Sequence, residues 1–222
     1  KKKLNMAAVS SFMQYGNVPT PHCIFENSYK LKPGHFLEFT LNDSLPEELL
    51  TPENQRCYWN VYDSYNKPKL ELSFNDAKIE TEKILKNACD YRMVSDVPVG
   101  VFLSGGYDSA SVTALLQKDR TQPLKTFTIS VPDIGLDEAP FAKEIALYLG
   151  TDHTEIQCSH KEAIDLIEDL PFYYDEPFAD SSAIPTTLVS LAARKHVTVA
   201  LSADAGDEVF AGYNRYDYIQ RY

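Results

Sequence analysis

The strongest chemical signal in this chain is a serine and glycine turn, SGGYDS, which runs from Ser104 to Ser109. An apolar stretch that favours a strand precedes the turn, and a stretch with helical periodicity follows it. Two adjacent glycines can adopt positive φ and leave backbone N–H groups uncovered, so the turn can hold an anion at the start of the helix. The two serine hydroxyls add donors, and Asp108 could hold a Mg²⁺ that bridges phosphates. The pattern predicts a phosphate site.

The alternative for this turn is structural. Asp108 or Ser109 could simply cap the helix that follows, as short polar side chains commonly do. Capping alone does not require two glycines, so the phosphate interpretation is the better supported of the two.

A second signal is an acidic loop, SADAGDE, from Ser202 to Glu208. Its three carboxylates lie within five residues and repel one another unless a cation lies among them, so a divalent metal is a natural partner. A solvated acidic start of a helix would account for the same residues. Taken alone, this loop leaves both interpretations open.

The elements that must position these loops alternate between helix and strand from residue 73 onward, which predicts an open parallel α/β sheet with helices on both faces. The predicted strands cover residues 97–103, 127–131, 153–158 and 197–201. The predicted helices cover residues 74–91, 110–115, 141–149, 163–170 and 185–195. In a 3-2-1-4 strand order the first and fourth strands are neighbours, so both loops would face one crevice beyond the carboxyl ends of the strands.

The first 72 residues follow a different pattern. A helix is predicted over residues 4–15 and a short strand over residues 35–39, and residues 42–72 are proline-containing and polar, as in a connecting segment. We therefore divide the chain into two parts, residues 1–72 and residues 73–222.

Composition narrows the class of protein. With 222 residues of which 44% are apolar, the chain can bury a substantial core. Its net charge of −11 disfavours binding to nucleic acid, and no apolar run approaches the roughly 20 residues of a membrane span. Its four cysteines lack metal-ligand spacing, which favours reduced thiols and a cytoplasmic protein.

The glycine–serine turn, preceded by SDVPVGV at residues 95–101, resembles the pyrophosphate loop of the glutamine-dependent asparagine synthetases, which are N-type ATP pyrophosphatases. The likeness continues in order through TFTI (126–129), LGTDH (149–153), DEPFAD (175–180) and residues 201–213. Residues 18–39 are similar to the end of that family's glutaminase domain. The resemblance implies that residues 1–72 are a small α+β remnant of the glutaminase domain with its linker. It implies that residues 73–222 are the first part of a synthetase domain with an adenine nucleotide alpha hydrolase-like sheet, and that this domain is truncated here.

The resemblance also implies roles for residues. The ATP phosphates would be held by Ser104, Gly105, Gly106, Asp108 and Ser109. The nucleoside would be contacted by Leu103, Ile129, Ser202 and Ala203. Asp204 would lie near the reacting carboxylate and act with Asp108 in catalysis, and Mg²⁺ would be bound by Asp108 and Asp207.

The implied function is that of an ATP-dependent amide ligase in asparagine biosynthesis. Such an enzyme adenylates a carboxylate, here expected to be that of aspartate, releases pyrophosphate, and forms the amide with ammonia derived from glutamine. Two alternatives stay open. One is a related amidotransferase with another acceptor, of the β-lactam synthetase or surface-polysaccharide type, and the other is a non-catalytic nucleotide-binding relative.

Three departures from the family pattern qualify this expectation. Relatives usually carry glycine at the positions of Ala203 and Ala205, so methyl groups could crowd the approach of ATP. The family's glutaminase uses an amino-terminal cysteine, whereas this chain begins with Lys1. A carboxyl-terminal catalytic lysine of the family would lie beyond Tyr222. We expect a fragment that does not hydrolyse glutamine by itself, and homodimerisation is left open.

Overall fold

The computed structural model of the chain describes residues 2–38, 54–131 and 137–220. The chain forms two compact units, and neither is continuous in sequence. The first unit comprises Lys1–Glu71 with Glu168–Ala183, and the second comprises Leu72–Ile167 with Ile184–Tyr222. The junction after Glu71 lies next to the boundary expected from the sequence. The return of residues 168–183 to the first unit was not expected.

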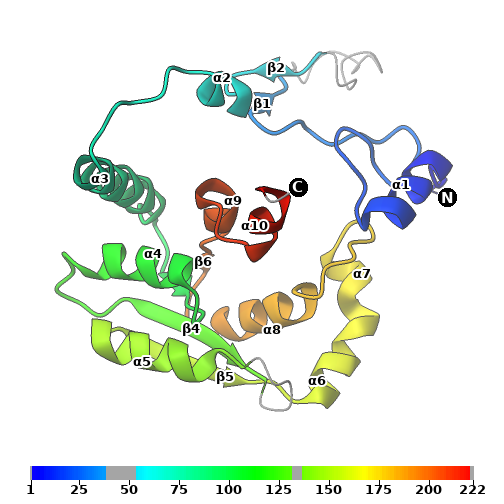
Figure 1. Cartoon of the computed structure of the whole chain (residues 1–222). Helices are drawn as coiled ribbons and strands as arrows, with labels where there is room; N and C mark the ends of the chain where they lie inside the picture. The colour runs from blue at the N-terminus through cyan, green and yellow to red at the C-terminus, as the bar shows by residue number, and fades with distance from the viewer. Residues whose placement is uncertain (1, 39–53, 132–136, 221–222) are drawn as a thin grey trace. The chain divides into compact units, whose positions relative to one another are not determined.

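The first unit is built around helix α1 (Met6–Tyr15) (Figure 1). The side chain of Asn5 accepts hydrogen bonds from two backbone N–H groups of its first turn, and Gly16 ends the helix in the left-handed region at φ 73°. Ala8 of the helix packs with Val18 and Ile24 in a small apolar core. This unit also contains the antiparallel strands β1 (His35–Phe36) and β2 (Arg56–Cys57) and helix α2 (Val61–Tyr65). The returning segment contributes helix α7 (Leu170–Tyr173), which follows a short 3₁₀ helix, Leu166–Asp169. The predicted strand over 35–39 extends at its end outside the described residues.

Polar contacts bind the DEPFAD segment to the first unit. The carboxylate of Glu176 forms an ion pair with Lys30 and accepts a hydrogen bond from the backbone N–H of Ile24 at 3.2 Å. The N–H of Ala179 donates to the carbonyl of Gly16 at 2.8 Å. Glu176 is therefore used in holding the segment in place.

The second unit contains one parallel sheet with the strand order β5-β4-β3-β6. Its strands are β3 (Val99–Phe102), β4 (Lys125–Ser130), β5 (Asp152–Gln157) and β6 (Val199–Leu201). Because these are the first, second, third and fourth strands of this unit in sequence, the observed order is 3-2-1-4. The predicted order is confirmed.

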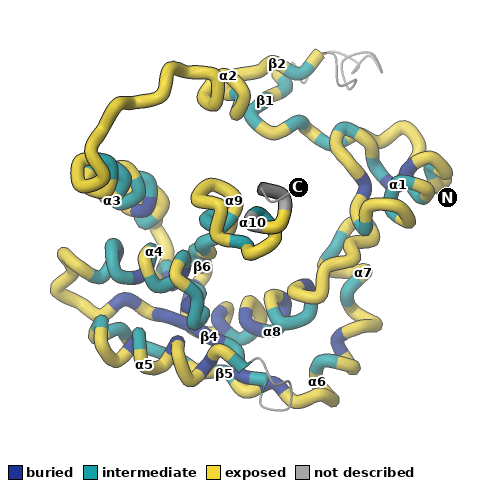
Figure 2. The backbone as a smooth tube through the Cα atoms, in the orientation of Figure 1, coloured by how far each residue is buried: buried dark blue, intermediate teal, exposed yellow. Residues whose placement is uncertain are grey.

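Helices cover both faces of this sheet. The helices are α3 (Phe74–Arg92), α4 (Tyr107–Gln117), α5 (Ala139–Leu149), α6 (His160–Asp165), α8 (Ala183–Ala193), α9 (Gly206–Phe210) and α10 (Asn214–Gln220). Val101 packs with residues of α3 and α4, and Leu103 with residues of α5. Phe127 packs with α8 through Val189. Figure 2 shows the buried positions along β4 and on α8. The predicted fold class, an open parallel sheet with helices on both faces, is confirmed.

Close packing explains one glycine inside a strand. A Cβ atom on Gly100 of β3 would lie 2.6 Å from the ring of Phe127 on the neighbouring strand. Phe127 is 1% exposed, and it is one of the largest fully buried side chains of the described residues. Glycine at position 100 therefore makes room for the aromatic ring that joins β4 to α8.

No helix of the described residues is long and apolar enough to cross a membrane. The four cysteines are all free thiols, as the sequence predicted.

A buried polar cluster joins β4 to the start of β5. The hydroxyl of Thr126 hydrogen-bonds to the hydroxyl of Thr151 and to Nδ1 of His153, both at 2.9 Å. Nε2 of His153 is buried and has no hydrogen-bond partner among the described residues. Burial lowers the pKa of His153 below its usual value of 6.5, since a proton on Nε2 would lack an acceptor.

We therefore expect the protein to lose stability as the pH falls below 6.5. The unfolded chain takes up more of a proton on His153 in this range than the native chain does, so the unfolding free energy decreases toward acid pH, by at most about 1.4 kcal/mol per pH unit for one group. Thermal unfolding between pH 8 and pH 5 measures this slope. The variant His153→Gln should flatten it, and an unchanged slope in that variant would assign the effect to other groups.

Candidate functional site

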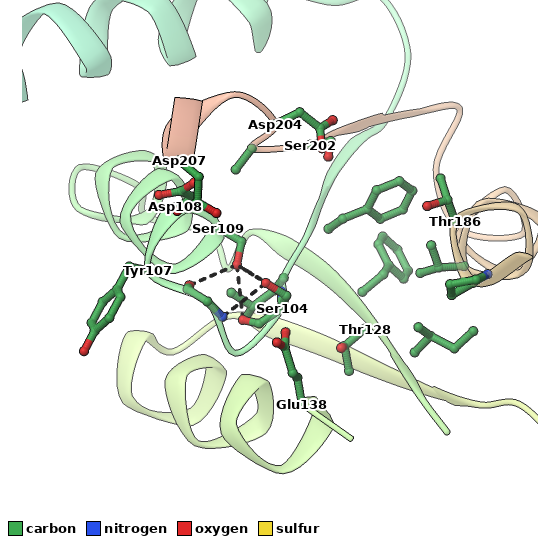
Figure 3. A pocket seen from close by; sticks show the side chains of 18 residues that line it. Ser104, Tyr107, Asp108, Ser109, Thr128, Glu138, Thr186, Ser202, Asp204 and Asp207 are labelled. Atoms are coloured by element: carbon green, nitrogen blue, oxygen red, sulfur yellow. Dashed lines mark hydrogen bonds between the residues drawn. The ribbon is translucent and has the colours of Figure 1, made fainter. Parts of the chain in front are cut away.

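The glycine–serine turn and the acidic loop meet at one edge of the sheet. The turn follows β3 and the loop follows β6, and these strands pair directly, with Val101 opposite Leu201. The carboxyl ends of parallel strands lie at the same edge, so both segments line one cleft of about 600 Å³ (Figure 3). The predicted site residues that line this cleft are Leu103, Ser104, Gly106, Asp108, Ser109, Ile129, Ser202, Ala203, Asp204 and Asp207. Of the predicted set, only Gly105 does not line it.

Neither glycine of the turn has the positive φ that was predicted, and Gly105 is needed for close packing instead. Positive φ among the glycines of the described residues occurs at Gly16, Gly34 and Gly150, so neither Gly105 nor Gly106 is left-handed. A Cβ atom on Gly105 would lie 2.9 Å from Cβ of Phe141, which means that glycine here lets α5 approach the turn closely. The expectation of positive φ is wrong for this turn, and the constraint is steric.

The capping interpretation of the turn is also not what the structure contains. Gly106 is the N-cap of α4, and no side chain caps the N–H groups of the first turn of that helix. The first N–H groups of α4 therefore carry no side-chain cap at the end of the helix that meets the cleft. Tyr107, the first residue of the helix, lines the cleft and is 94% exposed, and its ring points away from the other labelled side chains in Figure 3.

The hydroxyl of Ser109 is the centre of the turn's hydrogen bonds (Figure 3). It accepts from the N–H of Ser104 at 3.0 Å and lies 2.8 Å from the hydroxyl of that residue. It also lies within 3.3 Å of the carbonyl oxygens of Ser104 and Gly106. Ser109 is 6% exposed. One buried hydroxyl thus fixes the shape of the turn.

Of the three aspartates with predicted roles, Asp108, Asp204 and Asp207, the first and the last lie at the same end of the cleft. The carboxylate of Asp108 lies against Gly206, where a Cβ atom would overlap it, and Gly206 directly precedes Asp207. Figure 3 shows the side chains of Asp108 and Asp207 next to each other and that of Asp204 beside Ser202. The structure thus brings together the two residues predicted as metal ligands, while Asp204 occupies a separate part of the cleft wall.

The donor set at this end suits magnesium only if the ligand supplies the remaining oxygens. No group of three or more metal-binding side chains occurs among the described residues. Mg²⁺ is commonly held by one or two carboxylates together with substrate phosphates and water, so Asp108 and Asp207 fit such an ion bound with a nucleotide.

The acidic loop contains a backbone conformation that favours glycine. Ala205 has φ 73° and Ala211 has φ 57°, both in the left-handed region where a Cβ atom is unfavourable. Ala205 is also the N-cap of α9. Alanine at position 205 therefore strains the backbone at this position. This strain is independent of the space that its methyl group leaves for a ligand.

Sequence reasoning missed several residues of the cleft. Thr128 of β4, Glu138 at the start of α5, and Pro185 and Thr186 of α8 all line it. The signal that could have revealed Glu138 is its place after the second strand of a parallel sheet, since loops at that edge converge. The two residues of α8 carried no comparable signal.

We expect Ser109→Ala to destabilise the protein by about 1–3 kcal/mol, because the variant leaves the N–H of Ser104 without its partner. The matched control is Ser111→Ala, an exposed position of the same helix, where a change within about 0.5 kcal/mol is expected. Urea unfolding of both variants makes the comparison. Equal effects would show that the hydroxyl of Ser109 does not support the turn.

We expect Ala205→Gly to raise the unfolding free energy by about 0.5–1 kcal/mol, because glycine adopts the left-handed conformation without strain. Ala114→Gly, in the interior of α4, should instead lower it by a similar amount, since glycine weakens a regular helix. The same unfolding measurement compares the two, and destabilisation by both changes would argue against strain at position 205.

A protein family and several known proteins match this chain in sequence. Residues 80–222 match the asparagine synthase family. The chain is 38% identical over 217 residues to "Putative asparagine synthetase [glutamine-hydrolyzing] 2" of Methanocaldococcus jannaschii, covering 96% of this chain and 39% of that protein. It is 33% identical over 221 residues to "Asparagine synthetase [glutamine-hydrolyzing] 1" of Bacillus subtilis, covering 96% of this chain and 32% of that protein.

A solved structure that matches is the NH3-dependent NAD synthetase of Campylobacter jejuni, with a TM-score of 0.39 and 13% identity over 64% of this chain and 62% of that one. The chain spans 39% and 32% of the lengths of the two asparagine synthetase relatives. The family match covers most of the second unit, including the turn and the acidic loop, and this chain belongs to the asparagine synthase family.

Proposed function

We propose that this chain supplies the nucleotide-binding part of an ATP-dependent amidotransferase that adenylates a carboxylate, with aspartate as the first candidate acceptor. One observation carries the proposal: the glycine–serine turn and the acidic loop line the same cleft. A phosphate-binding turn next to paired carboxylates suits a metal-bound triphosphate. We also assign residues 1–72 to the end of a glutaminase domain and its linker, on the likeness of residues 18–39.

The phosphates are assigned to the turn and to the start of α4. The hydroxyl of Ser104, the N–H of Gly105 and the uncapped first turn of α4 offer donors at one end of the cleft, whereas the N–H of Gly106 and the hydroxyl of Ser109 are used within the turn. In adenylation, an oxygen of the acceptor carboxylate bonds to the α-phosphorus while the bond to pyrophosphate breaks. Fixed donors stabilise the negative charge that grows on the leaving pyrophosphate.

The nucleoside is assigned to the other end of the cleft. Leu103 is 1% exposed, Ile129 lies at the end of β4, and Val189 of α8 continues the apolar wall. Ser202 and Ala203 form the facing wall. An apolar slot beside a polar turn matches the division of a nucleotide into a flat base and charged phosphates.

Asp108 and Asp207 are assigned to Mg²⁺, which would supply positive charge between the phosphate oxygens. Asp204 is assigned to the acceptor side, because its side chain is separate from the other two carboxylates. In the second half of the reaction, ammonia derived from glutamine attacks the acyl carbon of the adenylate, AMP leaves and the amide forms. The two carboxylates at the phosphate end bind and orient, and they do not change their covalent bonds.

The second candidate is the same chemistry on a different acceptor. None of the described residues that line the cleft is lysine or arginine, so an acceptor with two carboxylates such as aspartate finds no cationic partner there. This absence favours an acceptor other than aspartate, as in related amidotransferases of the β-lactam synthetase or surface-polysaccharide type.

The proposal predicts that the intact protein that contains this chain releases pyrophosphate from Mg·ATP only when a suitable carboxylic acid is present. Exchange of labelled pyrophosphate into ATP, measured across a series of acids that begins with aspartate, identifies the acceptor. Asp108→Asn and Asp207→Asn should each lower the exchange rate by about a hundred-fold or more.

Asp165→Asn is the control, since it removes the same charge at an exposed position of α6 outside the cleft. Exchange with an acid other than aspartate would favour the second candidate. Binding of Mg·ATP without exchange for any acid would instead identify a non-catalytic nucleotide-binding relative.

A further inference from the structure

Glu138 is a cleft residue that the family resemblance assigned no role, and its backbone is tightly held. The hydroxyl of Ser130 donates to the neighbouring Asp137 at 2.8 Å, and the N–H of Ala139 donates to the same carboxylate at 3.1 Å. Although burial opposes the charge, these hydrogen bonds keep the pKa of Asp137 below its ordinary value. Ala139 on the other side is 1% exposed. Glu138 therefore lies between two anchored residues.

The approach of α5 to the glycine–serine turn sets where this side chain begins. A Cβ atom on Gly105 would lie 3.3 Å from Cβ of Glu138, so the start of α5 is in van der Waals range of the turn. Figure 3 shows the carboxylate of Glu138 extending toward Ser104, with Thr128 on its other side. Its carboxylate makes no hydrogen bond or ion pair with any residue that the structure describes.

The chemistry of a carboxylate limits what it can bind. An ionised carboxylate only accepts hydrogen bonds, and it repels phosphate oxygens. The described cleft lining offers it no lysine or arginine. The group of the ligand that meets Glu138 must therefore be a hydrogen-bond donor, such as a hydroxyl, an amine or an ammonium group, and not a phosphate oxygen.

The position of Glu138 indicates which donor this is. Figure 3 shows its carboxylate between Ser104 of the turn, assigned to phosphates, and Thr128 of β4. The residues next to Thr128 on that strand, Phe127 and Ile129, also line the cleft and belong to one apolar cluster with Val189. In a nucleotide the sugar lies between the phosphates and the base, and a ribose offers two adjacent hydroxyl donors. An acidic side chain that accepts from ribose hydroxyls is a common solution in nucleotide-binding α/β folds.

We propose that Glu138 accepts hydrogen bonds from the ribose hydroxyls and makes the cleft selective for ribonucleotides over deoxyribonucleotides. This inference rests on the proposed nucleotide function. Glu138 acts here as a specificity-determining residue that touches the sugar and takes no part in bond making. If Glu138 only stabilised the start of α5 through its charge, its replacement would not change the ratio of the affinities for ribonucleotides and deoxyribonucleotides.

The test measures binding to the full chain by isothermal titration calorimetry in the presence of Mg²⁺. The ligands are ATP, 2′-deoxy-ATP, 3′-deoxy-ATP and inosine triphosphate, which lacks the amine of adenine. The variants are Glu138→Ala, Glu138→Gln and the control Glu144→Gln, which removes the same charge from an exposed position of α5. Circular dichroism confirms that each variant folds.

We expect the unchanged chain to bind at least one deoxynucleotide about ten-fold more weakly than ATP, as the loss of one charge-assisted hydrogen bond predicts. Glu138→Ala should weaken ATP about ten-fold and abolish the preference for ribose, and Glu138→Gln should fall between it and the unchanged chain. Glu144→Gln should keep both the affinity and the preference.

Three results would overturn the assignment. Equal affinity of the unchanged chain for ATP and both deoxynucleotides would exclude recognition of the sugar while leaving the proposed function intact. A second contrary result has two parts. The unchanged chain would show no sugar preference but would prefer ATP over inosine triphosphate, and Glu138→Ala would lose that preference. This result would place the base amine at Glu138 instead. Absence of binding for every nucleotide would overturn the proposed nucleotide function together with this inference.

Discussion

The pairing of β3 with β6 is the contact on which the candidate site depends. Residues 99–101 pair in parallel with residues 199–201, so two segments far apart in sequence end at the same edge of the sheet. Closing so long a loop costs conformational entropy, and burial of Val101 and Phe127 on opposite faces of the sheet offsets part of that cost. Without this pairing, the turn and the acidic loop would not share a cleft.

The cleft is organised by contacts made within the chain itself. The hydroxyl of Ser109 holds the turn, Asp137 holds the start of α5, and Gly105 lets these two segments approach. Each of these contacts satisfies a polar group or removes a steric conflict near the place where a ligand would bind. Prearranged donors suit chemistry in which charge develops on a leaving group, because no reorganisation is needed during the reaction.

The parts of the fold that were predictable have strong local signals. Apolar runs marked β3 and β6, the alternation of helix and strand patterns indicated β4 and β5 between them, and Gly150 ends α5 in the left-handed conformation expected of a helix C-terminus. Segment 168–183 shows where such signals stop. The predicted helix over residues 163–170 reaches only the first three residues of this segment, and the segment's membership of the first unit depends on the ion pair of Glu176 with Lys30 and on the contact of Ala179 with Gly16, partners that are distant in sequence.

The amino-acid sequence by itself determined the kinds of element, the order of the strands by analogy with other parallel sheets, and the chemical groups available in the two loops. Only the tertiary structure decided which groups meet. It placed Asp108 against Gly206 and Glu138 in the cleft, and it showed that Gly105 is needed for packing and not for a left-handed turn. The reason is physical: periodicity and turn chemistry act over a few residues, whereas steric fit and polar contacts depend on segments that only the folded sheet brings together.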